Sequence, residues 1–326
     1  MMKYEIMDVK PFNDVYYIDC LHISLFTALK HFNGSAFSYI VNDNFIYKLC
    51  ETEKGLTLRI EKLGVEAFDK ITAFNGISIN YGYECGNEII DSIISALING
   101  CITIIPIDAY FYNHPYHKLF YLKEHHYQTI LVYGYDYEKK VFKTIDVNGF
   151  KWNKKDFCYK YEISFQDLIK CHEARFQSGF EDGTIIKVSK TTSSDIVTDN
   201  PHSYKDTLIN NMLFHKTEIL KGLQDIFILY DYIDQFDMDE PTAFNNLVAS
   251  VSNLYKIKNI LGNEYINSSL TDDILNVWIV IRNMFIKSNF NIVIKKEEFG
   301  CKLKQLFELE TMFYKNLFCF FDNYEL

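Results

Sequence analysis

Apolar positions recur at two different spacings over the first 190 residues, which predicts a mixture of helices and strands. Leu21, Leu25, Ala28 and Leu29 share one face of a helix predicted over 19–32, which ends at Asn33-Gly34. Further helices are predicted at 87–99 and from the Ser164 capping box to about 174. Short runs rich in β-branched residues predict strands at 101–107, 129–135, 140–146, 159–163 and 184–189.

Beyond residue 200 the pattern changes to long helices alone. We expect helices at 204–236 with a break near Gly222, from Pro241 to Gly262, from 271 or 272 to 288, and at 296–321. The Ser/Thr/Asp-rich stretch 191–200 lacks apolar periodicity and predicts a linker. The organisation expected is an α+β domain over 1–190, the linker 191–200, and an all-α helical bundle over 201–326.

Charge and hydropathy exclude several classes of partner. The 326 residues carry a net charge of −10, and they contain no Lys/Arg block such as a nucleic-acid binder presents. The longest apolar stretch, 89–107, is interrupted by polar residues such as Asp91 and Asn99 and is too broken to span a membrane. We therefore expect neither nucleic acid nor a membrane as partner.

The eight cysteines form no CxxC pair, so no structural zinc signature is present. No signal peptide opens the chain, which predicts a reduced, cytoplasmic protein without disulfides. Four histidines, His114, His117, His125 and His126, lie close together but match no standard zinc spacing. We expect neither a metal nor another cofactor.

Three features are ordered as thiol catalysis requires. Cys20 falls in the first turn of a helix with Asp19 at its N-cap, where the helix dipole favours a thiolate. His125-His126 precede the run 129–135, so an imidazole there can accept a proton. Asp146 ends the neighbouring strand, where a carboxylate can orient that imidazole.

These segments resemble a known family. Asp19-Cys20-Leu21-His22 opening a helix, Pro106-Ile107-Asp108-Ala109-Tyr110, the His-His segment before Leu131-Val132-Tyr133-Gly134-Tyr135-Asp136, and Ile145-Asp146 are similar to the butirosin biosynthesis protein H N-terminal family. Their order also resembles the C39-like, papain-fold cysteine peptidases. The resemblance covers about Tyr16 to Ala174 and implies a papain-like (C39-like) domain.

The resemblance also implies acyl transfer in secondary-metabolite assembly, with no cofactor. An acyl carrier protein would supply a thioester, and the acyl-enzyme formed on Cys20 would be resolved by a small-molecule amine or, in a thioesterase-like reaction, by water. Carried onto this chain, Cys20 is the nucleophile, His126 the general base and Asp146 the orienting group. C39-like enzymes place the histidine about where Gln128 stands, so a shift or bulge along the strand has to bring His126 there, or His125 is the base.

Other site residues and readings stay open. Asn13 is the residue nearest to the position of the family's oxyanion-hole glutamine, and Asp108 with Tyr110 follows a strand end where substrate-binding groups often lie. The same residues also suit a cysteine peptidase or amidase. With Gln128 in place of the histidine, a catalytically inactive papain-fold binding module is a third possibility. In the simplest structural reading Cys20 is a buried core cysteine and Asp146 forms a turn.

Overall fold

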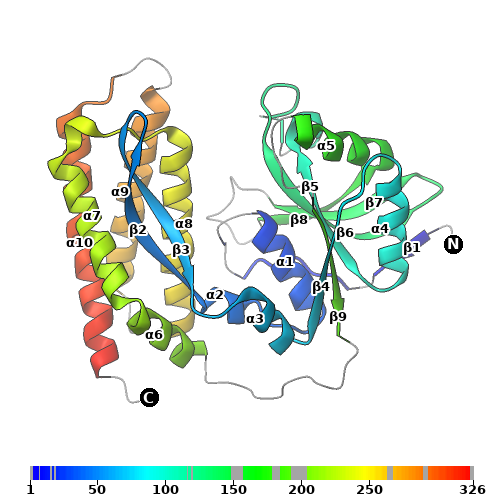
Figure 1. The fold of residues 1–326 in the computed structure, drawn as a ribbon, viewed down its shortest axis with the longest axis horizontal. Helices are drawn as coiled ribbons and strands as arrows, with labels where there is room; N and C mark the ends of the chain where they lie inside the picture. Colours follow the sequence, from blue (N-terminus) through cyan, green and yellow to red (C-terminus); the bar gives the residue numbers. More distant parts are fainter. Residues whose placement is uncertain are drawn as a thin grey trace. The chain divides into compact units, whose positions relative to one another are not determined.

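Each of the two units of the fold is built from two separate stretches of sequence (Figure 1). The computed structural model describes residues 3–6, 8–14, 17, 20–115, 117–118, 120–147, 157–177, 184–191, 204–262, 267–288 and 293–323. Met1–Ala36 and Phe68–Asp199 form the sheet unit, and Phe37–Ala67 with Asn200–Leu326 forms the helical unit. Asp19, Asn148, Gly149 and nearly all of the predicted linker lie outside the described residues.

The chain passes from the sheet unit to the helical unit between Asp199 and Asn200, in agreement with the linker predicted at 191–200. The assignment of residues 37–67 to the helical unit was not predicted. Residues 37–67 belong to the helical unit, so the predictions of a continuous 1–190 domain and of an all-α second domain are wrong. The reason is a hairpin, β2 (Asp43–Thr52) with β3 (Gly55–Gly64), whose two strands pair over ten residues and pack on helices of that unit. Contiguous sequence alone does not show on which core such a hairpin buries its face.

The described part of the sheet unit contains a seven-stranded, fully antiparallel sheet. Its order is β4-β9-β5-β6-β7-β8, and β1 pairs with β6 beyond the end of β5. The strands are β1 (Lys3–Glu5), β4 (Ile77–Gly82), β5 (Ile102–Asp108), β6 (Tyr127–Asp136), β7 (Val141–Val147), β8 (Cys158–Ser164) and β9 (Ile185–Lys190). The five predicted strands are confirmed to within a few residues, as is the hairpin turn between β6 and β7. The α+β class is therefore correct.

Helices cover the sheet. Every residue of β5 and nearly every residue of β6 is buried, as expected for strands enclosed on both faces. Helix α1 (Cys20–His31) packs on β5, β6 and β7, while α4 (Glu88–Ile98) and α5 (Phe165–Gln177) touch each other and lie on the other side (Figure 1). Ser164 caps α5 as predicted, because its Oγ accepts the Asp167 N–H at 3.0 Å. The short helix α3 (Phe68–Phe74) and the 3-10 turn η1 (Ala109–Phe111) complete the unit.

Gly134 in the Leu131–Asp136 motif has a structural explanation. A Cβ at this position would lie 2.9 Å from Tyr4 O and 3.1 Å from Glu5 Cα of the adjoining β1. The register between β6 and β7 also shifts between Val132 and Gly134, which marks a bulge. Glycine is therefore required by the close approach of β1.

The helical unit packs long helices around the hairpin. They are α6 (Tyr204–Phe214), α7 (Lys216–Asp231), α8 (Glu240–Leu261), α9 (Ser268–Ser288) and α10 (Lys296–Asp322), with α2 (Phe37–Ile40) and the 3-10 turn η3 (Ile233–Gln235). Asp239 caps α8, Pro241 lies in its first turn and Gly262 ends it at φ 92°, as expected. The predicted break at Gly222 is wrong, because the chain breaks at His215. Gly222 instead faces Tyr47, whose main-chain oxygen would lie 2.6 Å from a Cβ.

Among the described helices, none combines the length and the apolar character that a bilayer crossing demands.

Candidate functional site

Cys20 lies where two central strands separate. Among the described residues, β6 pairs with β5 from Tyr127 onward but with β7 from Leu131 onward, so the described ladders leave an opening between β6 and β7 at this end. The Thr129 N–H points into the opening and donates to Cys20 Sγ at 3.3 Å. Cys20 is the first residue of α1 and half-buried, so its sulfur also lies at the positive end of that helix. Both features favour a thiolate.

Asp146 is the centre of a buried hydrogen-bond cluster beside this opening. Gln128 Nε2 donates to its Oδ1 at 2.6 Å and to Val147 O at 3.1 Å, bridging the two separated strands. Its Oδ2 lies 2.7 Å from His117 Nε2 and accepts the Tyr159 hydroxyl at 2.9 Å. Asp146 is fully buried and Gln128 is 5% exposed. The carboxylate is thus held by neighbours on three different segments.

The strand register shows on which side of the sheet this cluster lies. Asp146 is directly opposite Tyr159, so the two side chains share a face. Cys158, the next residue along β8, points to the other face, where its Sγ donates to Phe12 O at 3.3 Å. Phe12 packs against Phe26 of α1, with ring centroids 5.4 Å apart. The Asp146 cluster therefore lies on the face away from α1, and the contact between α1 and β6 at the thiol is the Thr129 N–H bond to Cys20 Sγ.

His117 is the imidazole on Asp146, a position for which the sequence predicted His126. Its Nε2 donates to the buried carboxylate, which leaves Nδ1 with the lone pair when the ring is neutral. That Nδ1 is buried and has no hydrogen-bond partner in the described structure. A ring held by one nitrogen, with the other nitrogen unpaired, is arranged to take up a proton.

Aromatic residues enclose His117. Tyr112 lies 4.9 Å from it between ring centroids, and His114 stacks on Tyr159 at 4.9 Å. The hydroxyls of Tyr112 and Tyr161 are also buried without a partner in the described structure. The described residues contain no group of three or more His, Cys, Asp or Glu side chains arranged to hold a metal ion.

The predicted bases His125 and His126 belong to a second carboxylate, Asp108. His125 Nδ1 lies 2.6 Å from Asp108 Oδ2, and the His125 ring stacks on Tyr110 with 4.4 Å between centroids. Asp108 Oδ1 accepts the main-chain N–H groups of Tyr110 and His126. Asp108 is completely buried, so these bonds satisfy it and fix the end of β5. Its role in the structure is to organise this loop.

His126 is poorly suited to be the base on Asp146. Its ring stacks on Phe120 at 4.0 Å between centroids. Desolvation of the ring first, and then the nearby His117, lower the pKa of His126 to about 4, against the attraction of Asp108. The β6–β7 bulge lies at Val132–Gly134, too far along the strand to move His126 into the place of Gln128.

Asn13 does not face the thiol with its oxygen. Its Oδ1 accepts the main-chain N–H groups of Phe157 and Cys158 at 3.2 and 3.0 Å, which ties the segment before α1 to β8. These two bonds engage only the oxygen of Asn13, and the Nδ2–H groups, which an oxyanion hole would use, take no part in them. The Thr129 N–H beside Cys20 is the donor that the structure brings to the sulfur.

The structure joins Asp146 to Gln128 and His117, and it pairs His125 and the His126 main chain with Asp108 instead. Sequence reasoning missed His117 and Tyr159. His117 lies in a loop, outside the strands and helices, so neither the alternation of a strand nor the spacing of a helix face points to it. Its one signal is its place in a histidine-rich loop between two central strands.

No known protein-family model matches this chain, and no curated protein sequence matches it either.

Proposed function

We propose that the sheet unit is a papain-like, cysteine-dependent enzyme that transfers an acyl group from a thioester through an acyl-enzyme on Cys20. One observation carries the proposal: the Cys20 sulfur lies at the first residue of α1 and accepts the main-chain N–H of Thr129, the neighbour in sequence of the Gln128 that holds Asp146. A cysteine of the apolar core has a different environment, because burial raises the pKa of its thiol, as it does for Cys158.

His117 is the base in this proposal. Its Nδ1 takes the thiol proton as Cys20 Sγ attacks the thioester carbonyl, and Asp146 stabilises the imidazolium through Nε2. Collapse of the tetrahedral intermediate breaks the carbonyl–sulfur bond of the donor, and His117 returns the proton to the departing thiolate. An amine then attacks the acyl-enzyme, gives up a proton through His117, and releases Cys20.

Thioester chemistry suits the site better than peptide hydrolysis. The oxyanion donor that we infer beside the sulfur is a main-chain N–H, that of Thr129, rather than a side-chain amide. Amides need strong oxyanion stabilisation, whereas thioesters are better electrophiles. An acyl carrier protein as donor and a small-molecule amine as acceptor fit this preference.

The test is acylation of the intact chain by acyl thioesters, followed by intact mass measurement. We expect one adduct in the wild type, its loss in Cys20→Ala, and its retention in Cys101→Ala, a control at another half-buried cysteine of the same unit. An adduct that persists in Cys20→Ala, or none with any thioester, would refute the proposal.

A binding module without catalysis is the second candidate, and Gln128 favours it. Gln128 stands at the strand position where the resemblance predicts the base, and its amide already holds Asp146. A neutral amide cannot accept the thiol proton. In this reading the cluster is structural, and Cys20 reacts no faster than a free thiol.

A further inference from the structure

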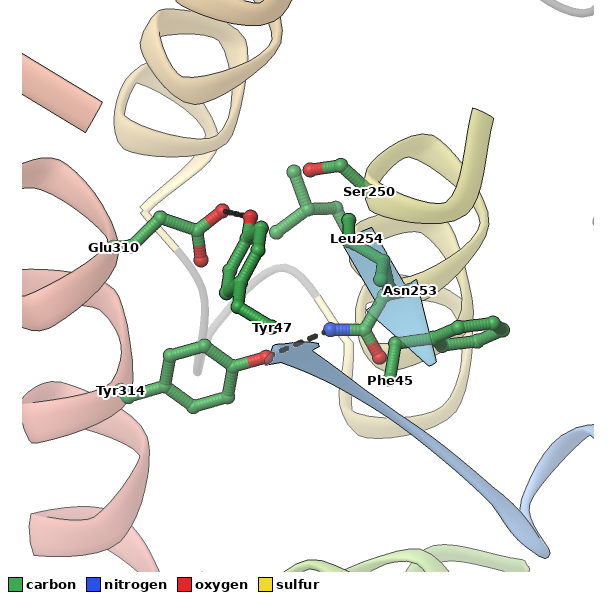
Figure 2. Close-up of a pocket in the computed structure, with 8 residues that line it drawn as sticks. Phe45, Tyr47, Ser250, Asn253, Leu254, Glu310 and Tyr314 are labelled. Atoms are coloured by element: carbon green, nitrogen blue, oxygen red, sulfur yellow. Dashed lines mark hydrogen bonds between the residues drawn. The ribbon is translucent and has the colours of Figure 1, made fainter. Parts of the chain in front are cut away.

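The core of the helical unit contains a buried carboxyl group in a network of neutral partners. Glu310 on α10 is 3% exposed and accepts the hydroxyl of Tyr47 from β2. Tyr47 in turn accepts the Trp278 indole N–H at 3.3 Å, and the neighbouring Tyr314 hydroxyl accepts Asn253 Nδ2 at 2.9 Å. Figure 2 shows Glu310, Tyr47, Tyr314 and Asn253 around a small cavity, which is also lined by Phe45, Ser250 and Leu254.

A buried amine lies in the same core. Lys256 on α8 is fully buried, and its Nζ donates to the main-chain oxygen of Asp43 at 2.6 Å. The ammonium also lies 5.2 Å from the Phe45 ring centroid. Phe45 lines the cavity beside Glu310, so the two buried ionisable groups border one region of the core.

Neither group has an ion-pair partner within the described part of the helical unit. Facing Glu310 are the phenols of Tyr47 on β2 and Tyr314 on α10, the indole of Trp278 on α9, and Asn253 with Ser250 on α8. Facing Lys256 is β2, where the Asp43 carboxylate lies 3.5 Å from Lys62 of β3 and is shared with that lysine. Burial of a charge without a direct partner costs free energy, so each group favours its neutral form.

We propose that Glu310 and Lys256 form a pH-sensitive device that makes the helical unit least stable near neutrality, where both buried groups begin to carry charge. Acid protonates the carboxyl group and removes its charge, and base deprotonates the amine and removes its charge. The proposal concerns the helical unit alone and is independent of the chemistry at Cys20.

The directions follow from linkage between folding and protonation. Burial raises the pKa of Glu310 from 4.5 to about 7, so its contribution to stability is full below pH 4.5 and is lost as the pH rises to about 7. Burial lowers the pKa of Lys256 from 10.5 to about 7, so its contribution is full above pH 10.5 and is lost as the pH falls to about 7. The free energy of unfolding of the helical unit should therefore fall from acid pH to about pH 7, which is the acid-side limb of the curve. It should rise again above about pH 7, which is the base-side limb.

Trp278 provides the reporter for a test in the full chain. Trp152→Phe leaves it as the single tryptophan, fully buried in α9. Urea unfolding followed by its fluorescence, from about pH 5 to about pH 9, yields the unfolding equilibrium constant of the helical unit. We expect that constant to rise and then to fall, each limb approaching about tenfold per pH unit because one proton is exchanged.

Single variants assign the limbs. Relative to the parent, Glu310→Gln should lose the acid-side limb and Lys256→Met the base-side limb, while Asp234→Asn, at an exposed ion pair, should keep both. Tyr47→Phe keeps the carboxyl group but removes a donor that lowers its pKa, so the acid-side limb should move to higher pH. Retention of the acid-side limb in Glu310→Gln, or an unmoved limb in Tyr47→Phe, would overturn the proposal.

Discussion

His117 donates its Nε2–H to Asp146 across 2.7 Å, and this buried pair replaces the histidine–aspartate pair predicted at His126. The pairing makes a loop histidine the base candidate, because its Nδ1 is buried and has no hydrogen-bond partner in the described structure.

Removing His117 should slow the reaction of Cys20 with iodoacetamide. We expect His117→Gln to lower the rate constant at pH 7 by about tenfold or more, because the thiol loses its proton acceptor. His126→Gln should stay within about twofold of the wild type, because His126 is engaged with Phe120 and Asp108. The measurement is the alkylation rate at Cys20 by peptide mass spectrometry, and the opposite ranking would make His126 the base.

Introducing a histidine on β6 distinguishes the enzyme from the inactive module. If the site is silent because Gln128 replaced the base, Gln128→His should raise the thioester acylation rate of Cys20 by about tenfold or more. If His117 is the base, the variant should gain nothing, because it breaks the bonds of Gln128 to Asp146 and Val147. Gln128→Glu, a matched change of similar size, controls for the loss of the amide.

Asp146 should matter for stability as well as for reactivity. Asp146→Ala leaves Gln128, His117 and Tyr159 without their shared acceptor, so we expect a loss of about 3–5 kcal/mol in the free energy of unfolding. Asp146→Asn keeps the shape and one acceptor oxygen, so it should cost less stability while still slowing alkylation of Cys20. Chemical denaturation and the alkylation assay measure the two effects. Equal, small effects of both variants on unfolding would contradict the buried cluster.

Gly134→Ala should destabilise the sheet unit by about 1–3 kcal/mol, because the added methyl group meets the main chain of β1. Gly300→Ala is the control, since a Cβ in this α10 position would make an ordinary 3.4 Å contact with the Tyr230 ring of α7, and alanine favours helix. Thermal unfolding should show a lower midpoint for the first variant and an unchanged or higher midpoint for the second. An unchanged midpoint in Gly134→Ala would mean that β1 does not hold its place on β6.

Acid should weaken the sheet unit through His172. This fully buried ring contacts the main-chain oxygens of Pro106 and Glu84, and burial, followed by Arg175, lowers its pKa from 6.5 to about 4. A lowered histidine pKa means that the folded state resists protonation. The contribution is full above pH 6.5 and falls by up to about 3 kcal/mol as the pH drops to 4.

Hydrogen exchange of β5, corrected for intrinsic rates at each pH, measures this loss. His172→Gln should flatten the dependence between pH 4 and 6.5, whereas His31→Gln, at a half-buried helix-end histidine, should change it much less. A steep dependence that survives in His172→Gln would assign the acid sensitivity to another group.

The sequence determined most of the local structure, because local structure depends on spacing and on caps that neighbouring residues supply. The strands from β5 to β9 follow β-branched runs, Ser164 and Asp239 cap helices, and Cys20 begins α1 where the pattern predicts a helix start. Asp146 was also predicted as a site residue from its place at a strand end, and Gln128 from the resemblance, and a hydrogen bond joins the two.

Tertiary structure alone decided which groups meet. His117 lies in a loop without periodicity, so only the folded chain brings its ring to Asp146, twenty-nine positions away in sequence. The hairpin of β2 and β3 could pack on either core, and the helices offered the matching apolar face and the partners for Tyr47. A buried polar group needs a partner at close range, and the sequence states neither the distance nor the partner.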